Sequence, residues 1–238
     1  SGTITTVNGV SYPFENKDIV KGSGYITRQC CSSTEIELGT VYAAEMGISL
    51  FSDIDRYTLD DAEVRLYFHL TLADGTEETI PMGVFEVSEA NRHIKTLELK
   101  AYDYMLRFDK NLQLNATSGM AYNFLFAACT ACKVEMAQTK AEIETLPNAK
   151  ETLGIYAEND METWRDLLFY VAQVLGCVCL INREGKLQLV PYSDTAVITI
   201  PQKERFSSSY SDFVTRYTAI SSTNQLKEIS EYYALEPD

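Results

Sequence analysis

The sequence predicts an α+β protein in which an antiparallel β-unit comes first and a smaller α/β unit follows. Two observations support this prediction. Before about residue 110, apolar and polar residues alternate along about seven short segments separated by turn residues, which is typical of a small antiparallel barrel or sandwich. After that point apolar residues recur at three- and four-residue spacing, which indicates helices that pack one face against a core.

The β-unit is marked by turn signals and alternating segments. The pair Asn8-Gly9 predicts a tight hairpin turn near the start of the chain. Two further strands are expected at residues 35–43 and 44–51. The clearest strand is expected at residues 64–72, and the turn pair Asp74-Gly75 follows it. Its alternation places five apolar residues on one face: Val64, Leu66, Phe68, Leu70 and Leu72.

The chain is organised around residues 80–110, two strand-like segments joined by a short polar turn that contains His93. Pro81 and Gly83 predict an edge position or a bulge just before the first segment. Period-two alternation predicts an inner wall formed by Phe85, Val87, Leu97 and Leu99. The opposite, polar face carries Glu86, Glu98 and Lys100.

The second unit is expected to contain two main helices and a β-hairpin. Thr117 or Ser118 can cap a helix that runs to about residue 133. Asn159, with Glu162 three residues later, has the pattern of a capping box before a second helix that ends at Gly176. The core face of that helix consists of Trp164, Leu167, Leu168, Val171, Val174 and Leu175. Residues 178–181 and 186–190 then form a hairpin, whereas residues 138–151 are expected to be a surface excursion.

These patterns divide the chain into three parts. Residues 1–110 form the antiparallel β-barrel domain, and residues 111–205 form the α/β domain, which ends with a short strand at 196–200. Residues 206–238 contain a strand at 213–220 that we expect to return to the first barrel, followed by a truncated C-terminal segment. Because the chain opens with Ser-Gly-Thr and closes without a terminal element, we expect it to be a fragment.

Composition excludes several classes of function. The chain has 238 residues and a formal net charge of -14, and a nucleic-acid-binding surface would instead need an excess of Lys and Arg to neutralise phosphates. The longest apolar run is well short of the ~20 residues that a membrane-spanning helix needs, and no signal-peptide pattern opens the chain. We therefore expect neither nucleic-acid binding nor membrane insertion.

The six cysteines are grouped as Cys30-Cys31, Cys129-x-x-Cys132 and Cys177-x-Cys179, which raises the question of a metal or redox site. The CxxC pair lies within an apolar helical run rather than on a tight polar turn, and the other pair lies on one face of a predicted strand. Buried free thiols in a reducing cytoplasm are therefore expected, and zinc or a disulfide is the alternative.

Two further hypotheses concern catalysis and carbohydrate binding. Paired carboxylates could act as acid and base, and the candidates are Asp60, Asp61 and Glu63, or Glu77 and Glu78. Both groups lie at turns beside strands, where charged residues are ordinarily solvated. The fifteen tyrosines could supply a stacking platform for sugars, with the candidates Tyr67, Tyr102, Tyr210 and Tyr217. We predict no catalytic, cofactor-binding or metal-binding residue, and we expect that the protein is not an enzyme.

Three segments together resemble a known family. Residues 32–41, 82–90 and 98–105, with the helix at Trp164 and the hairpin turn at 182–186, resemble prophage minor structural proteins of Gram-positive bacteria. These belong to the phage baseplate hub family, which is related to the late-control tail proteins. The resemblance covers most of the chain, and its motifs are structural signatures.

The resemblance implies a hub-type or tube-type β-barrel with an inserted α/β domain. It further implies a virion structural protein, made in the bacterial cytoplasm, that assembles as a trimer in a phage or prophage tail and connects the tail tube to the spike or tip. The polar face with Glu86, Glu98 and Lys100 would then face a neighbour or the channel. The alternative is a tail-associated protein that binds or hydrolyses carbohydrate or the cell wall.

Overall fold

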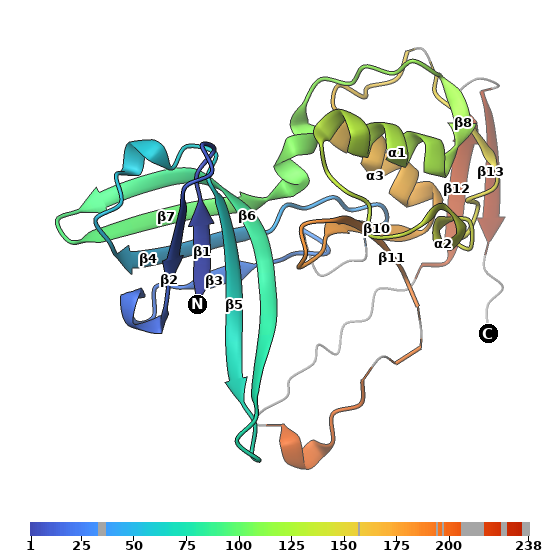
Figure 1. Cartoon of the computed structure of the whole chain (residues 1–238). Coiled ribbons are helices and arrows are strands. Elements are labelled where there is room, and N and C mark those ends of the chain that lie inside the picture. Colours follow the sequence, from blue (N-terminus) through green and yellow to red (C-terminus); the bar gives the residue numbers. More distant parts are fainter. Residues whose placement is uncertain are drawn as a thin grey trace.

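The structure is a computed structural model of the chain, and it describes residues 1–32, 37–156, 158–193, 195–196, 198–205, 217–224 and 228–234. The fold is α+β, with one large antiparallel sheet and few helices (Figure 1). The strands of the large sheet are β1 (Gly2–Thr5), β2 (Ser11–Phe14), β3 (Tyr25–Thr27), β4 (Glu45–Phe51), β5 (Glu63–Thr71), β6 (Glu77–His93) and β7 (Thr96–Asp103). The helices are α1 (Ala121–Cys132), α2 (Lys140–Ile143) and α3 (Trp164–Val174), with short 3-10 helices at Asn16–Asp18, Arg56–Thr58, Tyr104–Asp109 and Gln202–Glu204. The remaining strands are β8 (Ser118–Met120), β9 (Thr152–Gly154), β10 (Cys177–Ile181), β11 (Leu187–Pro191), β12 (Ala219–Asn224) and β13 (Ile229–Ala234).

The seven-stranded sheet has the order β2-β1-β5-β6-β7-β4-β3, and every neighbouring pair is antiparallel. Its apolar face covers a core that includes Ile4, Met46, Leu50, Val64 and Leu59. The predicted inner wall is confirmed, because Phe85, Val87, Leu97 and Leu99 are all buried in this core. Period-two alternation was therefore a sufficient guide to the buried face of β6 and β7.

The sheet is not a closed barrel within the described part of the chain. Its two edge strands, β2 and β3, are not paired with each other. The loop after β2 does approach β4, since Ile19 forms an isolated bridge with Leu50 and the Val20 amide donates to the Ser49 carbonyl at 2.9 Å. β3 is only three residues long and β2 contains Pro13, which lacks an amide donor, so both edges offer few groups for closure.

The strand expected at residues 35–43 is wrong for the part that the structure describes. Residues 37–44 have no strand, and residues 33–36 lie outside the described residues. Instead, this segment is held by the start of β10, because the Gly39 amide donates to the Cys177 carbonyl and the Cys179 amide donates to the Thr40 carbonyl. Gly39 has φ +81°, and a Cβ there would lie 2.6 Å from the carbonyl oxygen of Phe169 in α3. The segment therefore packs on the helical layer rather than extending the sheet.

The hairpin of β5 and β6 is longer than the rest of the sheet and projects beyond it (Figure 1). Its tip is the predicted Asp74-Gly75 turn, in which Gly75 has φ +85°. A register shift places Leu66 opposite Gly83 but Tyr67 opposite Pro81, so one residue of β6 bulges, as expected near Pro81 and Gly83. Gly83 has φ +151°, and an added Cβ would lie 2.6 Å from the ring of Phe85.

The helical layer packs α1 and α3 against the β10–β11 hairpin and the 3-10 helix at Tyr104–Asp109. α3 buries Trp164, Leu167 and Leu168, as its spacing predicts, and Gly176 with φ +60° follows it. The predicted caps are wrong. Thr163 and Asp166 form the capping box of α3, four residues after the predicted one. α1 begins after Met120 without a side-chain cap, because residues 118–120 form β8.

The surface segment expected at residues 138–151 contains a short helix and contributes two residues to the core. It contains α2, whose capping box is formed by Thr139 and Glu142, and its residues Ile143 and Ala149 belong to the helical core. β8 and β9 form a separate two-stranded sheet beside it.

The end of the chain differs from expectation where it is described. No strand occurs at the described residues 195–196 and 198–200. β12 pairs with β13 in a separate sheet rather than with the seven-stranded sheet. Residues 206–216, which include the first half of the strand that was expected to return to the first barrel, lie outside the described residues. The proposed division at residues 110 and 205 stays a prediction.

Asp103 lies where the sheet core and the helical core meet. Its carboxylate accepts hydrogen bonds from the backbone amides of Ala44 and Met105, each at 3.0 Å. Burial raises the pKa of this carboxyl group to about 6, although the two amide bonds and the nearby Arg28 and Arg165 favour its ionised form. A single buried acid therefore ties the end of β7 to both parts of the fold.

Candidate functional site

The outer half of the β5–β6 hairpin is the candidate functional surface. We call residues 67–82 the arm, because they extend past the rest of the sheet (Figure 1). Phe68 is 52% exposed, Leu70 38% and Leu72 41%. Strand alternation places Phe68 and Leu70 on the same face, and Ile80 joins them as the cross-strand partner of Phe68. The arm thus carries an apolar stripe with no core beneath it.

Beyond its base, the backbone edges of the arm are also unpaired within the described part of the chain. Pairing of β1 with β5 stops at Gly2 opposite Leu66, and pairing of β7 with β6 begins only at Phe85. Between Tyr67 and Met82, the backbone groups of β5 and β6 therefore bond only within the hairpin. A two-stranded ribbon with free edges is a template for another strand. An apolar stripe of this kind on a protruding element is typical of an interaction surface.

The arm is acidic as well as apolar. Asp74, Glu77 and Glu78 lie near its tip, and no Lys or Arg occurs between Leu66 and Asn91. The histidine of the arm, His69, is exposed and contacts the hydroxyls of Ser1 at 2.6 Å and Thr79 at 3.1 Å. His69 therefore bridges the start of the chain and β6 through two hydroxyl groups.

The base of the arm is fastened on both strands. On β5, Ser1 and Tyr67 exchange two backbone hydrogen bonds, of 3.1 and 2.9 Å. On β6, the Arg28 guanidinium donates to the Met82 carbonyl at 3.2 Å and to the Ile181 carbonyl of β10 at 3.0 Å. The arm is therefore anchored to the sheet and, through Arg28, to the helical layer.

The first group of candidate acids is part of an ionic cluster that fixes the 3-10 helix to the sheet. Glu63 accepts from the Arg65 guanidinium at 2.6 Å and from the Tyr104 hydroxyl. Burial raises the pKa of Glu63, but the hydrogen bonds from Tyr104 and Arg65 outweigh burial and the pKa is lowered overall. Glu86, opposite Glu63, forms a bidentate pair with Arg107, whose guanidinium lies 3.7 Å from the Tyr104 ring centre.

Asp60 and Asp61 lie beside this cluster. They line a shallow cavity together with Glu86 and Arg107. Asp61 has φ +56° and adopts the left-handed conformation in the turn before β5. The carboxylates of this group therefore have turn or ion-pair roles, and none is paired with another carboxylate by a shared hydrogen bond among those the structure describes.

The second group of candidate acids is not brought together as a pair. Glu77 and Glu78 are consecutive residues of β6, so their side chains point to opposite faces of the ribbon. Glu78 shares the face of Leu70 and Glu77 that of Thr71. Adjacent strand positions cannot share a proton, which removes the geometric basis of the acid–base hypothesis at this position.

Four of the six cysteines are buried free thiols, as expected: Cys129, Cys132, Cys177 and Cys179. Burial raises the pKa of Cys129 to about 12 and that of Cys177 to about 11, so these thiols stay protonated and inert at neutral pH. The expectation was wrong for the first pair, because Cys30 is exposed and Cys31 is half-buried.

Neither a metal-binding cluster nor a membrane-spanning helix is found among the described residues. No group of three or more His, Cys, Asp or Glu side chains in the described ranges is arranged to hold a metal ion. None of the described helices is both long enough and apolar enough to cross a bilayer.

The candidate sugar-stacking tyrosines lie on different elements. Tyr67 is half-buried at the base of the arm, and Tyr102 is half-buried on β7, where the ammonium of Lys100 lies 5.4 Å from its ring centre. Tyr217 is 50% exposed just before β12, and Tyr210 lies outside the described residues. The described tyrosines therefore do not belong to one common platform.

Sequence reasoning missed the exposure of the arm and the role of Arg28. The alternation of residues 64–72 correctly indicated a strand, yet only Val64 of its five apolar residues is buried. One signal was available in the sequence. No basic residue lies near Asp74, Glu77 and Glu78, which indicates a surface with uncompensated negative charge. No sequence signal pointed to Arg28, whose acceptors are main-chain carbonyls distant in sequence.

Comparisons with known proteins give a structural likeness but no match to a family or to a curated sequence. No protein-family model matches the chain, and no curated protein matches it. Among solved structures, the crystal structure of prophage MuSo2, 43 kDa tail protein from Shewanella oneidensis is similar over 82% of this chain, with 11% sequence identity and a TM-score of 0.48. The chain spans 56% of the length of that protein.

Proposed function

We propose that this protein is a structural subunit of a phage or prophage tail, and specifically a baseplate hub subunit that connects the tail tube to the spike or tip. In this proposal it is a virion component rather than an enzyme, and it assembles as a trimer with copies of itself. The sequence resemblance of residues 82–90 and 98–105 supports the family, and the arm supports the mode of action.

The observation that carries the proposal is the arm with its unpartnered apolar stripe and two free backbone edges. In an isolated subunit Phe68 and Leu70 are exposed and Ile80 is half-buried, at a cost of about 25 cal/mol for each Å² of apolar surface left in water. Covering the stripe with another subunit recovers this energy and pairs the free edges. An apolar stripe with free strand edges is therefore expected of a protein that assembles with other subunits.

Charge indicates how two copies would meet. Two arms that paired in parallel orientation would bring Asp74, Glu77 and Glu78 of one copy against those of the other. In the proposed arrangement, the arm of one copy instead lies on a different surface of the next. Such a head-to-tail contact is heterologous, and it generates a ring when the rotation closes. A trimeric ring is consistent with this contact, and an open edge such as β2 or β3 would receive the arm and complete the barrel.

Light scattering coupled to size-exclusion chromatography tests the proposal. We expect the mass of the full chain to rise with protein concentration toward three times the 26.8 kDa chain mass. Phe68→Ser with Leu70→Ser should keep the protein monomeric without lowering its melting temperature. Phe126→Ser is the matched control, because Phe126 is 56% exposed on α1, away from the arm, and should leave the mass unchanged.

A monomer at every concentration, including in the presence of co-expressed tail-tube subunits, would reject the proposal. An equal effect of the Phe126 and arm substitutions would show instead that general surface hydrophobicity drives association.

A further inference from the structure

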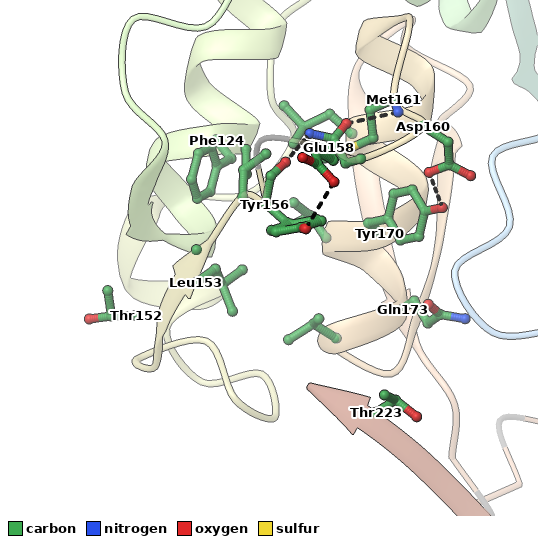
Figure 2. Close-up of a pocket in the computed structure, with 16 residues that line it drawn as sticks. Phe124, Thr152, Leu153, Tyr156, Glu158, Asp160, Met161, Tyr170, Gln173 and Thr223 are labelled. Carbon is green, nitrogen blue, oxygen red and sulfur yellow. Dashed lines mark hydrogen bonds between the residues drawn. The ribbon is translucent and has the colours of Figure 1, made fainter. Parts of the chain in front are cut away.

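A second surface has the shape of a binding groove, and it lies on the helical layer. Its volume is about 700 Å³, and it is lined by α1, β9, residues 155–156 and 158–161, and α3, with Thr223 of β12 at one side (Figure 2). A groove of this size accommodates several side chains of a bound segment.

The floor of the groove is apolar and rigid. Phe124, Leu167 and Val171 line it, and each is at most 4% exposed because its other side packs in the helical core. Val174 extends this floor at the end of α3 and is 37% exposed. Since these residues are fixed by core packing, the floor is preformed for an aliphatic ligand group.

The rim carries two carboxylates that are held in place. The Tyr156 hydroxyl donates to Glu158 at 3.2 Å, and the Tyr170 hydroxyl donates to Asp160 at 2.8 Å, as Figure 2 shows. Asn159 fixes the loop between them, because its side chain bonds to the Tyr156 carbonyl and accepts from the Met161 amide. The two carboxylates therefore stand in a loop with defined geometry.

The rim has no balancing positive charge among the groove-lining residues that the structure describes. None of them is Lys, Arg or His. The two nearby tyrosine hydroxyls already donate to the carboxylates, so the remaining lone pairs of Glu158 and Asp160 can only accept. The groove therefore combines an aliphatic floor with an acceptor rim of negative charge.

We propose that this groove binds a segment of another protein in which lysine or arginine stands beside aliphatic residues. The aliphatic side chains would lie on Val171 and Val174, and the cation would reach Glu158 and Asp160 while its methylene stem covers the floor. A neutral sugar fits less well, because it would leave the negative charge of the rim unbalanced. The arm of a second copy is excluded as the occupant by its own carboxylates.

Fluorescence anisotropy with the full chain tests this site. The probes are a labelled peptide in which leucine alternates with lysine and a matched peptide in which leucine alternates with glutamate. We expect the lysine peptide to bind and the glutamate peptide not to bind. Glu158→Gln with Asp160→Asn should weaken binding by about tenfold, since each exposed ion pair contributes little alone.

Two further variants make the result specific. Val174→Arg should also weaken binding, because it places a cation over the floor, and it keeps the test valid if the rim variant folds poorly. Glu184→Gln is the matched control, because Glu184 is an exposed carboxylate of the β10–β11 turn outside the groove. Its affinity for the lysine peptide should equal that of the unaltered chain.

Equal binding of the two peptides, no binding of the lysine peptide, or an affinity unchanged by both groove variants would overturn the proposal. Displacement of the peptide by an N-acetylglucosamine oligosaccharide that binds more tightly would overturn it in favour of a sugar site. The light-scattering mass of the groove variants should be unchanged, so failure here is distinguishable from failure of the hub proposal.

Discussion

The two halves of the β5–β6 hairpin have the same alternating pattern but opposite environments. In the inner half, Val64 and Phe85 are fully buried in the sheet core. In the outer half, Phe68 and Leu70 are on average nearly half exposed, although they continue the same apolar series. The difference teaches that alternation identifies which residues share a face, whereas burial depends on whether another layer covers that face.

The largest expected effect comes from placing a charge in the inner half. Leu97 is fully buried opposite Leu50 of β4, so Leu97→Asp buries a carboxylate without a partner. We expect a loss of more than about 4 kcal/mol of unfolding free energy, which abolishes cooperative unfolding in urea. Circular dichroism measures this, and an unfolding midpoint close to that of the unaltered chain would show that the assigned core face is wrong.

A matched pair of truncations compares the two halves directly. Phe85→Ala should cost about 3–5 kcal/mol, because it leaves a cavity in a packed core. Phe68→Ala should cost less than about 1 kcal/mol, because the ring of Phe68 is 52% exposed. Urea unfolding of both variants gives the two values. Similar losses would mean that the arm is covered in the folded monomer.

We expect the stability of the protein to depend on pH through Asp103, which lies between the sheet core and the helical core. The pKa of Asp103 is raised to about 6 in the folded state, so the folded protein binds this proton more readily than the unfolded chain does. The unfolding free energy of the unaltered chain should therefore rise relative to Asp103→Asn as the pH falls from 7 to 4. The expected gain is about 2 kcal/mol. A constant difference across this pH range would contradict the burial argument.

The smallest effect is expected on the polar face of the same sheet. Glu98 and Lys100 lie on β7 next to fully buried Leu97 and Leu99, but their own side chains point away from the core. Glu98→Gln with Lys100→Gln should leave the urea midpoint unchanged, and any effect should appear only in the assembled mass. A midpoint lowered as far as that of Leu97→Asp would show that the two faces have been assigned in reverse.

Local patterns predicted most of the strands because turn chemistry and alternation are local. Asp74-Gly75 and Gly176 were identified correctly, since a positive φ at these positions favours glycine. Whether the sheet closes into a barrel was not predictable in the same way. Closure would require β2 to pair with β3, and such pairing depends on residues far apart in sequence. The cap of α3 was missed because Asn159 and Thr163 both match the motif, and Asn159 instead stabilises its own turn.

The candidate surfaces were less predictable than the fold. Phe68, Leu70 and Ile80 look like core residues in the sequence, and only the end of β1 at Gly2 and the start of β7 pairing at Phe85 show that the arm stands alone. The groove depends on the approach of α3 and β9 to residues 155–156 and 158–161, and no short motif encodes this approach.

The bulge next to Gly83 is the point at which the direction of the arm relative to the sheet is set. Strand geometry places the Asp74-Gly75 turn roughly 25 Å from this point, so a change of about 10° in the bulge moves the tip by about 4 Å. That displacement is close to the spacing between neighbouring strands, about 4.8 Å. A Cβ at Gly83 would lie 2.6 Å from the Phe85 ring. Any other residue at this position would therefore shift either the Phe85 ring or the backbone of the bulge. Gly83 therefore sets the direction in which the arm projects from the sheet.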